Sequence, residues 1–328
     1  MKQLRILVTG GAGFLGSSLC ESLVASGHKV VALDSLFRGS LTNLEIISQS
    51  PDFHFIEADV RDLESLDISV EWLGGLDIVY HLAAVNGTKW FHEAAHSVID
   101  VNINGTLRTL ELAMAHDARY VLASSPEAFG DGEQQPVRDG NLMQFSNPAE
   151  HQRHSYGASK YLDEVACQHA AREGLDVRII RPFNAYGPRL SGDEYGQVVS
   201  IFFQNIIDGK PISIHGDGSQ TRSFTWIDDV TDGFLKVGLL DNALDGSELS
   251  GAAFNIGSTE EINIKNLADK IIQVSGSQNT ELISSDGYFG DSKRRVPDIE
   301  QSKKLLGWQL KVPLSDGLQY MWDSLQSN

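Results

Sequence analysis

The sequence predicts an α/β protein with a doubly wound parallel sheet and a smaller mixed α/β region in its C-terminal part. Two observations lead to this fold class. Up to Pro182, short β-rich runs alternate strictly with segments of helical apolar spacing, and this alternation favours parallel strands joined by right-handed helical crossovers. Beyond Pro182 the alternation stops, so the remaining chain is expected to cover the carboxyl ends of the strands, where doubly wound sheets bind ligands.

The individual elements follow from the apolar periodicity, which repeats every two residues in strands and about every 3.6 residues in helices. In the first part we expect strands at residues 4–8, 29–33, 53–57, 77–82, 119–123 and 176–180, and helices at 15–25, 98–115 and 155–172. Gly27 stands where the first helix should end. In the second part we expect strands at 212–215 and 253–256 and helices at 198–207, 228–240, 264–274, 299–306 and 314–325.

Composition narrows the classes of function. The chain has 328 residues and a net charge of −18, which argues against partners such as nucleic acid or anionic membranes, because both require a basic face. No apolar run is long enough to span a bilayer, and residues 4–8 are typical of a strand rather than a signal peptide. We therefore expect a cytoplasmic protein. Cys20 and Cys167 lie outside any metal or redox spacing and are expected to be buried free thiols.

A glycine-rich turn follows the first strand. Residues 11–16 spell G-x-G-x-x-G, Gly10 precedes them, and the segment opens a helix. In this setting glycines allow a tight turn and let a pyrophosphate approach backbone N–H groups at the helix N-terminus. Asp34 ends the next strand, and a carboxylate there accepts hydrogen bonds from ribose hydroxyls and repels a 2′-phosphate. The pattern indicates a Rossmann domain that binds NAD, although Arg38 is close enough in sequence to leave NADP open.

Two interleaved domains are expected from these patterns. Residues 1–182, together with about 225–250, should form the NAD-binding Rossmann domain. Residues 183–224 and 251–328 should form the substrate-binding domain, because the sequence contains neither an internal repeat nor a long linker between the two parts.

A second constellation lies near the predicted helix at 155–172. Tyr156 and Lys160 are four residues apart and therefore neighbours on one face of that helix. A phenol titrates near 10 and is a poor base at neutral pH, but an adjacent ammonium and a positive nicotinamide would favour its ionised form. Ser124 and Ser125 follow the fifth predicted strand and supply a hydroxyl that could hold a substrate oxygen. Together with the glycine turn, this set indicates dehydrogenase chemistry.

On these residues the chain resembles the extended short-chain dehydrogenases/reductases that epimerise, dehydrate or decarboxylate nucleotide sugars. The resemblance covers nearly the whole chain, at residues 9–16, 81–84, 101–106, 124–130, 156–160, 181–188, 216–224 and 294–298. It implies that Ser125 takes the catalytic Ser/Thr position, with Tyr156 as the base and Lys160 as its partner. It also implies a homodimer formed through the helices at 98–115 and 155–172.

The resemblance further implies which residues bind the cofactor and the substrate. The NAD set comprises Gly10, Gly13, Phe14, Leu15, Gly16, Asp34, Asp59, Val60, Leu82, Ala83, Ala84, Asn102, Tyr156 and Lys160. Within it, Asp59 and Val60 would contact adenine or belong to a plain loop. The nucleotide-sugar set comprises Asn86, Gly87 and Thr88 in the loop at 85–90, and then Asn184, Arg189, Arg222 and Arg295. The arginines would form a positive pocket for a diphosphate within an acidic chain.

The residues after Ser125 bear on the reaction. Members of this family first oxidise a sugar carbon, usually C4, and then return the hydride, lose carbon dioxide or eliminate water. The dehydratases carry Asp-Glu at this point, whereas this chain has Pro126-Glu127, and proline cannot donate a proton. Glu127 and Arg295 match positions important in UDP-glucuronate decarboxylases, but Pro126 replaces a serine and Phe129 the usual tyrosine.

We therefore favour a UDP-sugar 4-epimerase with tightly held NAD, and decarboxylation of a UDP-uronic acid is the nearest alternative. Glu127 is then either a second acid/base or a hydrogen-bonded wall of the pocket. A non-catalytic NAD-binding scaffold is the alternative from another class, but its mark would be a broken Ser/Tyr/Lys set, and all three residues are present.

Three histidine features are interpreted as structural. Residues 92–96 spell H-E-x-x-H, the zinc-protease string, but no third ligand motif follows. His151 and His154 precede Tyr156 without metal-type spacing and are expected to be loop residues. No metal is therefore expected.

Overall fold

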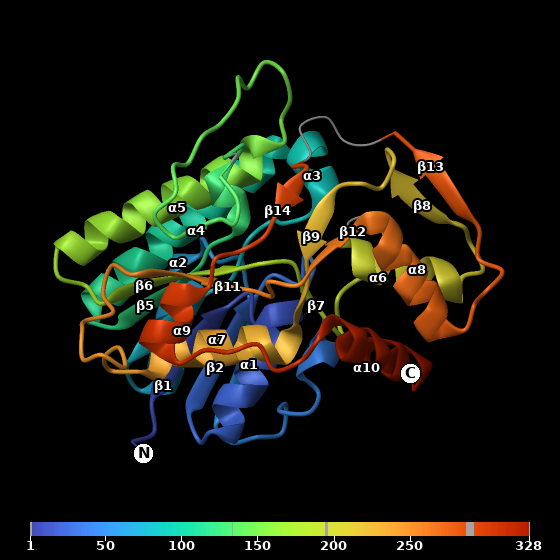
Figure 1. The fold of residues 1–328 in the computed structure, drawn as a ribbon. Helices are drawn as coiled ribbons and strands as arrows, with labels where there is room; N and C mark the ends of the chain where they lie inside the picture. The colour runs from blue at the N-terminus through green and yellow to red at the C-terminus, as the bar shows by residue number, and fades with distance from the viewer. Residues whose placement is uncertain (1, 133, 194–195, 287–291, 328) are drawn as a thin grey trace.

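The computed structural model describes residues 2–132, 134–193, 196–286 and 292–327. A central sheet of seven parallel strands dominates it (Figure 1). The order across this sheet is β11 (Ala253–Ile256), β6 (Val177–Pro182), β5 (Arg119–Ala123), β4 (Ile78–His81), β1 (Arg5–Thr9), β2 (Lys29–Asp34) and β3 (Phe53–Glu57). Because the chain leaves β1 first toward β2 and later crosses to β4, the strand order reverses at β1, and such a reversal opens a crevice at the carboxyl ends of the strands.

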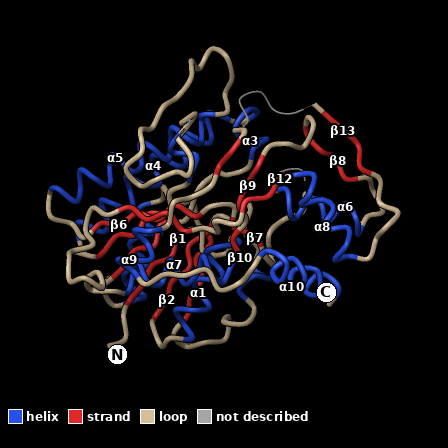
Figure 2. Tube along the Cα trace, in the orientation of Figure 1, coloured by secondary structure: helices blue, strands red, loops and turns tan. Residues whose placement is uncertain are grey.

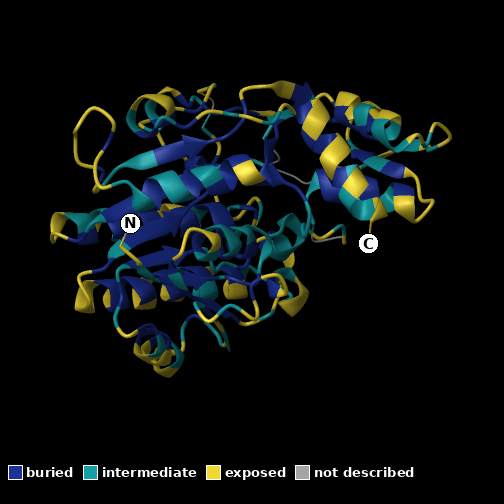
Figure 3. Cartoon of the chain, turned by 90° about the horizontal axis from the view of Figure 1, so that it is seen from below, coloured by how far each residue is buried: buried dark blue, intermediate teal, exposed yellow. Residues whose placement is uncertain are grey.

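Helices cover both faces of the sheet (Figure 1). One face carries α1 (Phe14–Ala25), α7 (Ile227–Leu239) and α9 (Glu300–Leu306), and the other carries α2 (Leu63–Leu73), α4 (Ala95–Ala115) and α5 (His154–Arg172). Strand side chains alternate between the faces: Ile6 and Val8 of β1 join the first layer, whereas Leu7 joins the second. The sheet is therefore buried on both sides, which suits its continuous apolar runs (Figure 3).

The C-terminal part forms a second, smaller core beside the sheet (Figure 2). Its helices are α6 (Val198–Ile207), α8 (Ile264–Ser275) and α10 (Leu314–Gln326). It has two strand pairs, β8 (Ile212–His215) with β13 (Leu282–Ser285) and β7 (Ala185–Tyr186) with β10 (Thr225–Trp226). It also has a three-stranded sheet in the order β12 (Glu261–Asn263), β9 (Thr221–Ser223) and β14 (Arg294–Arg295). Aromatic residues fill this core, among them Phe202, Phe203 and Trp226.

The six predicted strands of the first part are present, with ends displaced by at most two residues. Gly27 follows Ser26, the C-cap residue of α1, and has a φ of 82°, the left-handed conformation expected of a helix-ending glycine. The helix predicted at 98–115 begins earlier, at Ala95, and two helices were not predicted, α2 and α3 (Thr88–Glu93). The strand predicted at 253–256 is β11, and it pairs with β6 in the central sheet, although the boundary at residue 251 assigned it to the second domain.

No helix in the described part of the chain is both long and apolar enough to cross a membrane. Cys20 and Cys167 are buried free thiols, as predicted.

Candidate functional site

A cavity of about 1110 Å³ lies at the carboxyl ends of the central strands, between the sheet and the second core. It is lined both by the turns that follow β1, β4 and β5 and by residues of the C-terminal part. Of the predicted site residues, these line it: Gly10, Gly13, Phe14, Leu15, Gly16, Asp34, Asp59, Val60, Leu82, Ala83, Ala84, Asn86, Gly87, Thr88, Ser125, Glu127, Tyr156, Lys160, Asn184, Arg189 and Arg222. Asn102 and Arg295 do not.

The glycine turn at the start of α1 is too tightly packed for side chains. Gly10 has a φ of 70°, and a Cβ there would lie 2.8 Å from the backbone nitrogen of Ala83. A Cβ on Gly16 would overlap the carbonyl oxygen of Gly10. The first turn of α1 has neither a side-chain cap nor an acidic residue, so its N–H groups and the positive end of the helix dipole are available to an anion.

Asp34 braces this turn from the end of β2. Its carboxylate accepts hydrogen bonds from the backbone N–H groups of Ala12 at 3.0 Å and Leu36 at 2.8 Å. Burial raises the pKa of Asp34, and these backbone hydrogen bonds oppose that rise. Because Asp34 also lines the cavity next to the glycines, the two features together fit the pyrophosphate and adenosine ribose of a dinucleotide.

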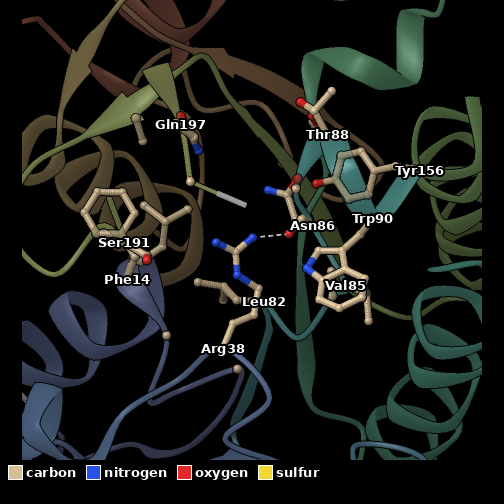
Figure 4. A pocket seen from close by; sticks show the side chains of 18 of the residues that line it. Phe14, Arg38, Leu82, Val85, Asn86, Thr88, Trp90, Tyr156, Ser191 and Gln197 are labelled. Atoms are coloured by element: carbon tan, nitrogen blue, oxygen red, sulfur yellow. Dashed lines mark hydrogen bonds between the residues drawn. The ribbon is translucent and has the colours of Figure 1, made fainter. Parts of the chain in front are cut away.

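Arg38 reaches across the cavity (Figure 4). Its guanidinium donates a hydrogen bond to the backbone carbonyl of Asn86, which follows β4. Phe37 and Trp90 make a second contact between the same two segments, with ring centroids 5.2 Å apart. The segment at 85–90, predicted to be a loop, turns into α3 at Thr88, so the predicted sugar-contacting residues stand at a helix start.

Asn102 of α4 acts on the cavity indirectly. Its side-chain oxygen accepts a hydrogen bond from the backbone N–H of Val85 at 2.8 Å, and its amide donates to the hydroxyl of Ser159 at 3.0 Å. The residue is fully buried. It therefore ties the segment after β4 to α5, the helix that carries the predicted catalytic pair.

Several predicted ligand-binding side chains already have protein partners. Asp59 receives two hydrogen bonds from the guanidinium of Arg61, at 2.8 and 2.6 Å. Arg189 is ion-paired with Glu21 of α1 at 2.6 Å. Asn184 donates to the carbonyl of Ser223 at 2.7 Å. These residues line the cavity as predicted, and their contacts hold its walls together.

The predicted catalytic pair lies on the first turns of α5. Tyr156 is buried and stacks on Phe91 of α3, with ring centroids 4.8 Å apart and planes within 8°. Burial raises the pKa of the Tyr156 phenol, and Lys160 and Ser125 lower it only in part. The expected lowering by the ammonium is thus outweighed by desolvation, because the phenolate would have to form in a buried site.

Pro126 is compatible with the backbone that follows Ser125. It is the first residue of a 3-10 helix, η2 (Pro126–Phe129), and Ser125 precedes it in an extended conformation, with φ −155° and ψ 152°. The first residue of a helix needs no N–H donor, so proline is tolerated there. Ser125 caps η2 by accepting a hydrogen bond from the backbone N–H of Glu127 at 3.2 Å.

Glu127 of η2 lines the cavity and lies among arginines. Arg295 forms an ion pair with it, and Arg153 lies 3.3 Å from its carboxylate. Burial raises the pKa of Glu127, but the charges of Arg295, Arg153 and Arg222 outweigh burial and lower it to about 2. Glu127 is therefore ionised at neutral pH.

Arg153 was not predicted, although it is buried and lines the cavity. The available signal was its place three residues before Tyr156, at the start of the same helix. Arg295 lies outside the cavity lining and reaches it through Glu127.

The histidines of the H-E-x-x-H string do not share a helix. His92 belongs to α3 and His96 to α4, and Ala94 breaks the helical path with φ −134°. His154 is the first residue of α5 and not a loop residue; its ring nitrogen pairs with Asp131 at 2.9 Å. His151 lies in the loop before it. Within the described residues, no three His, Cys, Asp or Glu side chains are arranged to hold a metal ion.

Comparison with known proteins decides the family. A sequence profile of the NAD-dependent epimerase/dehydratase family matches residues 6–257. The chain belongs to this family. It is 35% identical to UDP-glucuronic acid decarboxylase 1 of Arabidopsis thaliana over 98% of the chain and 69% of that relative. The predicted membership of the nucleotide-sugar epimerase, dehydratase and decarboxylase group is therefore confirmed.

Two solved structures share the whole fold. UDP-glucose 4-epimerase of Thermotoga maritima, solved with UDP-glucose, superimposes with a TM-score of 0.88 at 27% identity and covers 98% of each chain. UDP-glucuronic acid 4-epimerase of Bacillus cereus, solved with UDP-glucuronic acid and NAD, has a TM-score of 0.86 at 28% identity and covers 98% of this chain and 99% of its own. The predicted fold and the prediction of NAD as cofactor are confirmed.

Proposed function

We propose that this chain decarboxylates a UDP-uronic acid through a 4-keto sugar. The observation that carries the proposal is the cluster in the cavity wall, where Arg153, Arg222 and Arg295 surround the single carboxylate of Glu127. Three guanidinium groups thus act on this one carboxylate, in a chain of net charge −18. A sugar carboxylate is an anion that such guanidinium groups would bind through charge-assisted hydrogen bonds.

The chain's own groups would serve this reaction in order. NAD held by the glycine turn and Asp34 would supply the hydride acceptor for the sugar C4 and the donor for the later return of that hydride. Tyr156 would take the proton of the C4 hydroxyl, and Ser125 would hold the same oxygen. The C4 ketone then accepts the electron pair released when the bond between C5 and the carboxylate breaks and carbon dioxide leaves. A proton added at C5 and the return of hydride to C4, with the proton from Tyr156, complete the product.

Epimerisation at C4, which the sequence alone favoured, is the second candidate. The state of Glu127 supports it: a carboxyl with a pKa of about 2 has no proton to give to C5 at neutral pH. Decarboxylation would need a water activated at this cluster as the proton source, whereas epimerisation needs only that the ketone turn over before hydride returns. The two solved structures compared above are both 4-epimerases, and one of them holds UDP-glucuronic acid.

The test is incubation with a panel of UDP-, GDP-, CDP- and dTDP-sugars that includes UDP-glucuronic acid, followed by NMR of the products. A UDP-pentose and carbon dioxide from UDP-glucuronic acid support decarboxylation, and an epimer of unchanged mass supports the second candidate. Arg153→Met should raise KM for a uronate at least tenfold, since one charge-assisted contact is lost. Arg138→Met is the matched control, because Arg138 is exposed and pairs with Asp298 at 3.3 Å.

We also propose a homodimer. The neighbouring helices α4 and α5 expose a row of apolar side chains, unusual for the outside of a soluble protein. The row comprises Ile99, Leu107, Met114, Tyr161, Leu162 and Val165. Light scattering should give twice the chain mass of 35.9 kDa, and Leu162→Glu should reduce it to one. A monomeric wild-type protein would contradict the proposal.

A further inference from the structure

A buried carboxylate lies behind the predicted catalytic lysine. Asp163 follows Lys160 by three residues on α5, and each residue is only 1% exposed. Lys160 Nζ donates a hydrogen bond to Asp163 Oδ2 at 3.1 Å. The Y-x-x-x-K spacing alone predicts an ammonium that serves Tyr156, whereas the structure shows this ammonium also bound to the carboxylate of Asp163.

The other carboxylates near this pair have cationic partners of their own. Glu164 makes two hydrogen bonds with the guanidinium of Arg181, at 2.7 and 2.6 Å, and Glu127 is held by Arg153 and Arg295. The charge of Lys160 is thus matched to Asp163. Because both side chains are out of water, their attraction is weakly screened.

The remaining titratable neighbours stay neutral around pH 7. Burial lowers the pKa of His81 on β4, whose ring pairs with the hydroxyl of Thr9 at 2.8 Å. Burial raises the pKa of Tyr120 on β5 and of Cys167 on α5. Thr106 of α4 also lies beside Asp163 and carries no charge.

We propose that Asp163 is a positioning residue that holds the Lys160 ammonium and offsets its charge beside Tyr156. This inference rests on the proposed roles of Tyr156 and Lys160. Lys160 lowers the pKa of Tyr156 and Asp163 raises it. Removing the charge of Asp163 therefore makes Tyr156 lose its proton at a lower pH, whereas a purely structural role of Asp163 predicts no such movement.

Fluorine NMR of protein labelled with 3-fluorotyrosine tests this without any substrate. The chain has eight tyrosines, and Tyr156→Phe identifies the resonance of Tyr156. In Asp163→Asn this resonance should titrate at least about half a pH unit lower than in the wild type, since a charge a few ångströms away shifts a pKa by this order. Where Asp163→Asn does not fold, Asp163→Ser carries the same expectation, because its smaller side chain leaves room for a water beside Lys160.

Two controls separate charge from packing. Glu173→Gln makes the same change of charge at the exposed end of α5 and should leave the Tyr156 titration unmoved. Asp163→Glu keeps the charge and should titrate close to the wild type. An unmoved resonance in Asp163→Asn, or an equal shift in Asp163→Glu, would overturn the inference. A protein without turnover whose Tyr156 resonance still shifts would contradict the proposed function and leave the inference on Asp163 intact. An active protein whose resonance does not shift would contradict the inference and leave the proposed function intact.

Discussion

Replacing Glu127 by glutamine should remove one pH-dependent part of the stability of this fold. The carboxyl has an ordinary pKa of 4.5, and its arginine neighbours lower this to about 2 in the folded chain. A lowered pKa contributes stability that is fully present above the unfolded pKa and is lost as pH falls toward the folded one. Between pH 6 and pH 3 this contribution falls only over the roughly 1.5 pH units below the unfolded pKa of 4.5. At about 1.4 kcal/mol per pH unit, the free energy of unfolding loses about 2 kcal/mol.

Urea unfolding at a series of pH values measures this loss. The free energy of unfolding of the wild type should fall about 2 kcal/mol more between pH 6 and pH 3 than that of Glu127→Gln. At pH 6 the variant should be less stable, because two largely buried guanidinium groups lose their anionic partner. Parallel pH dependences for the two proteins would refute the reasoning, since they would mean that Glu127 titrates normally in the folded state.

Three further predictions concern the cofactor and the base. Tyr156→Phe should lower kcat by roughly 10²- to 10⁴-fold while the NAD content, measured after release by acid, stays unchanged; a kcat near that of the wild type would exclude Tyr156 as the base. Gly16→Ala should reduce NAD content and thermal stability, because its Cβ overlaps the Gly10 carbonyl, whereas Gly140→Ala, with no atom near its Cβ, should change neither. Asp34→Ala should raise the Kd for NAD about tenfold and narrow the preference over NADP in calorimetric titrations; an unchanged ratio of the two affinities would show that Asp34 does not read the ribose.

The sequence predicted the central sheet well because its signals are local. Each parallel strand is buried on both faces, so it stands out as a short apolar run between turns. The position of β11 in the sheet was not predicted, because a strand of four residues carries no local signal of its partner. Seventy residues separate β11 from β6, the strand with which it pairs. The helix α2 was missed, although Asp62 caps its start and Gly74 ends it with φ 75°.

The candidate site also has features that the sequence predicts and features that form only in the fold. The glycine turn, Asp34 and the Tyr156–Lys160 pair were predictable because each is a short motif with a fixed geometric task. The cluster around Glu127 was predicted only in part: Glu127 and Arg295 were named from the resemblance, whereas Arg153 was not, because it comes from a distant part of the chain and meets Arg295 only in the fold. The Lys160–Asp163 pair lies within one helix turn and could be read from the sequence. Its burial, which reduces the screening of the two charges, could not, because it depends on packing against α4 and β5.

The central claim is that the sugar carboxylate is lost through a 4-keto sugar. The most direct measurement is the reaction of purified protein with UDP-glucuronic acid in heavy water, followed by proton NMR and mass spectrometry. The account predicts a UDP-pentose that carries one deuterium at C5, because the carbon that loses carbon dioxide takes its proton from solvent, and none at C4, because the same hydride returns. A UDP-hexuronic acid epimer of unchanged mass without deuterium would contradict the account and establish epimerisation in its place.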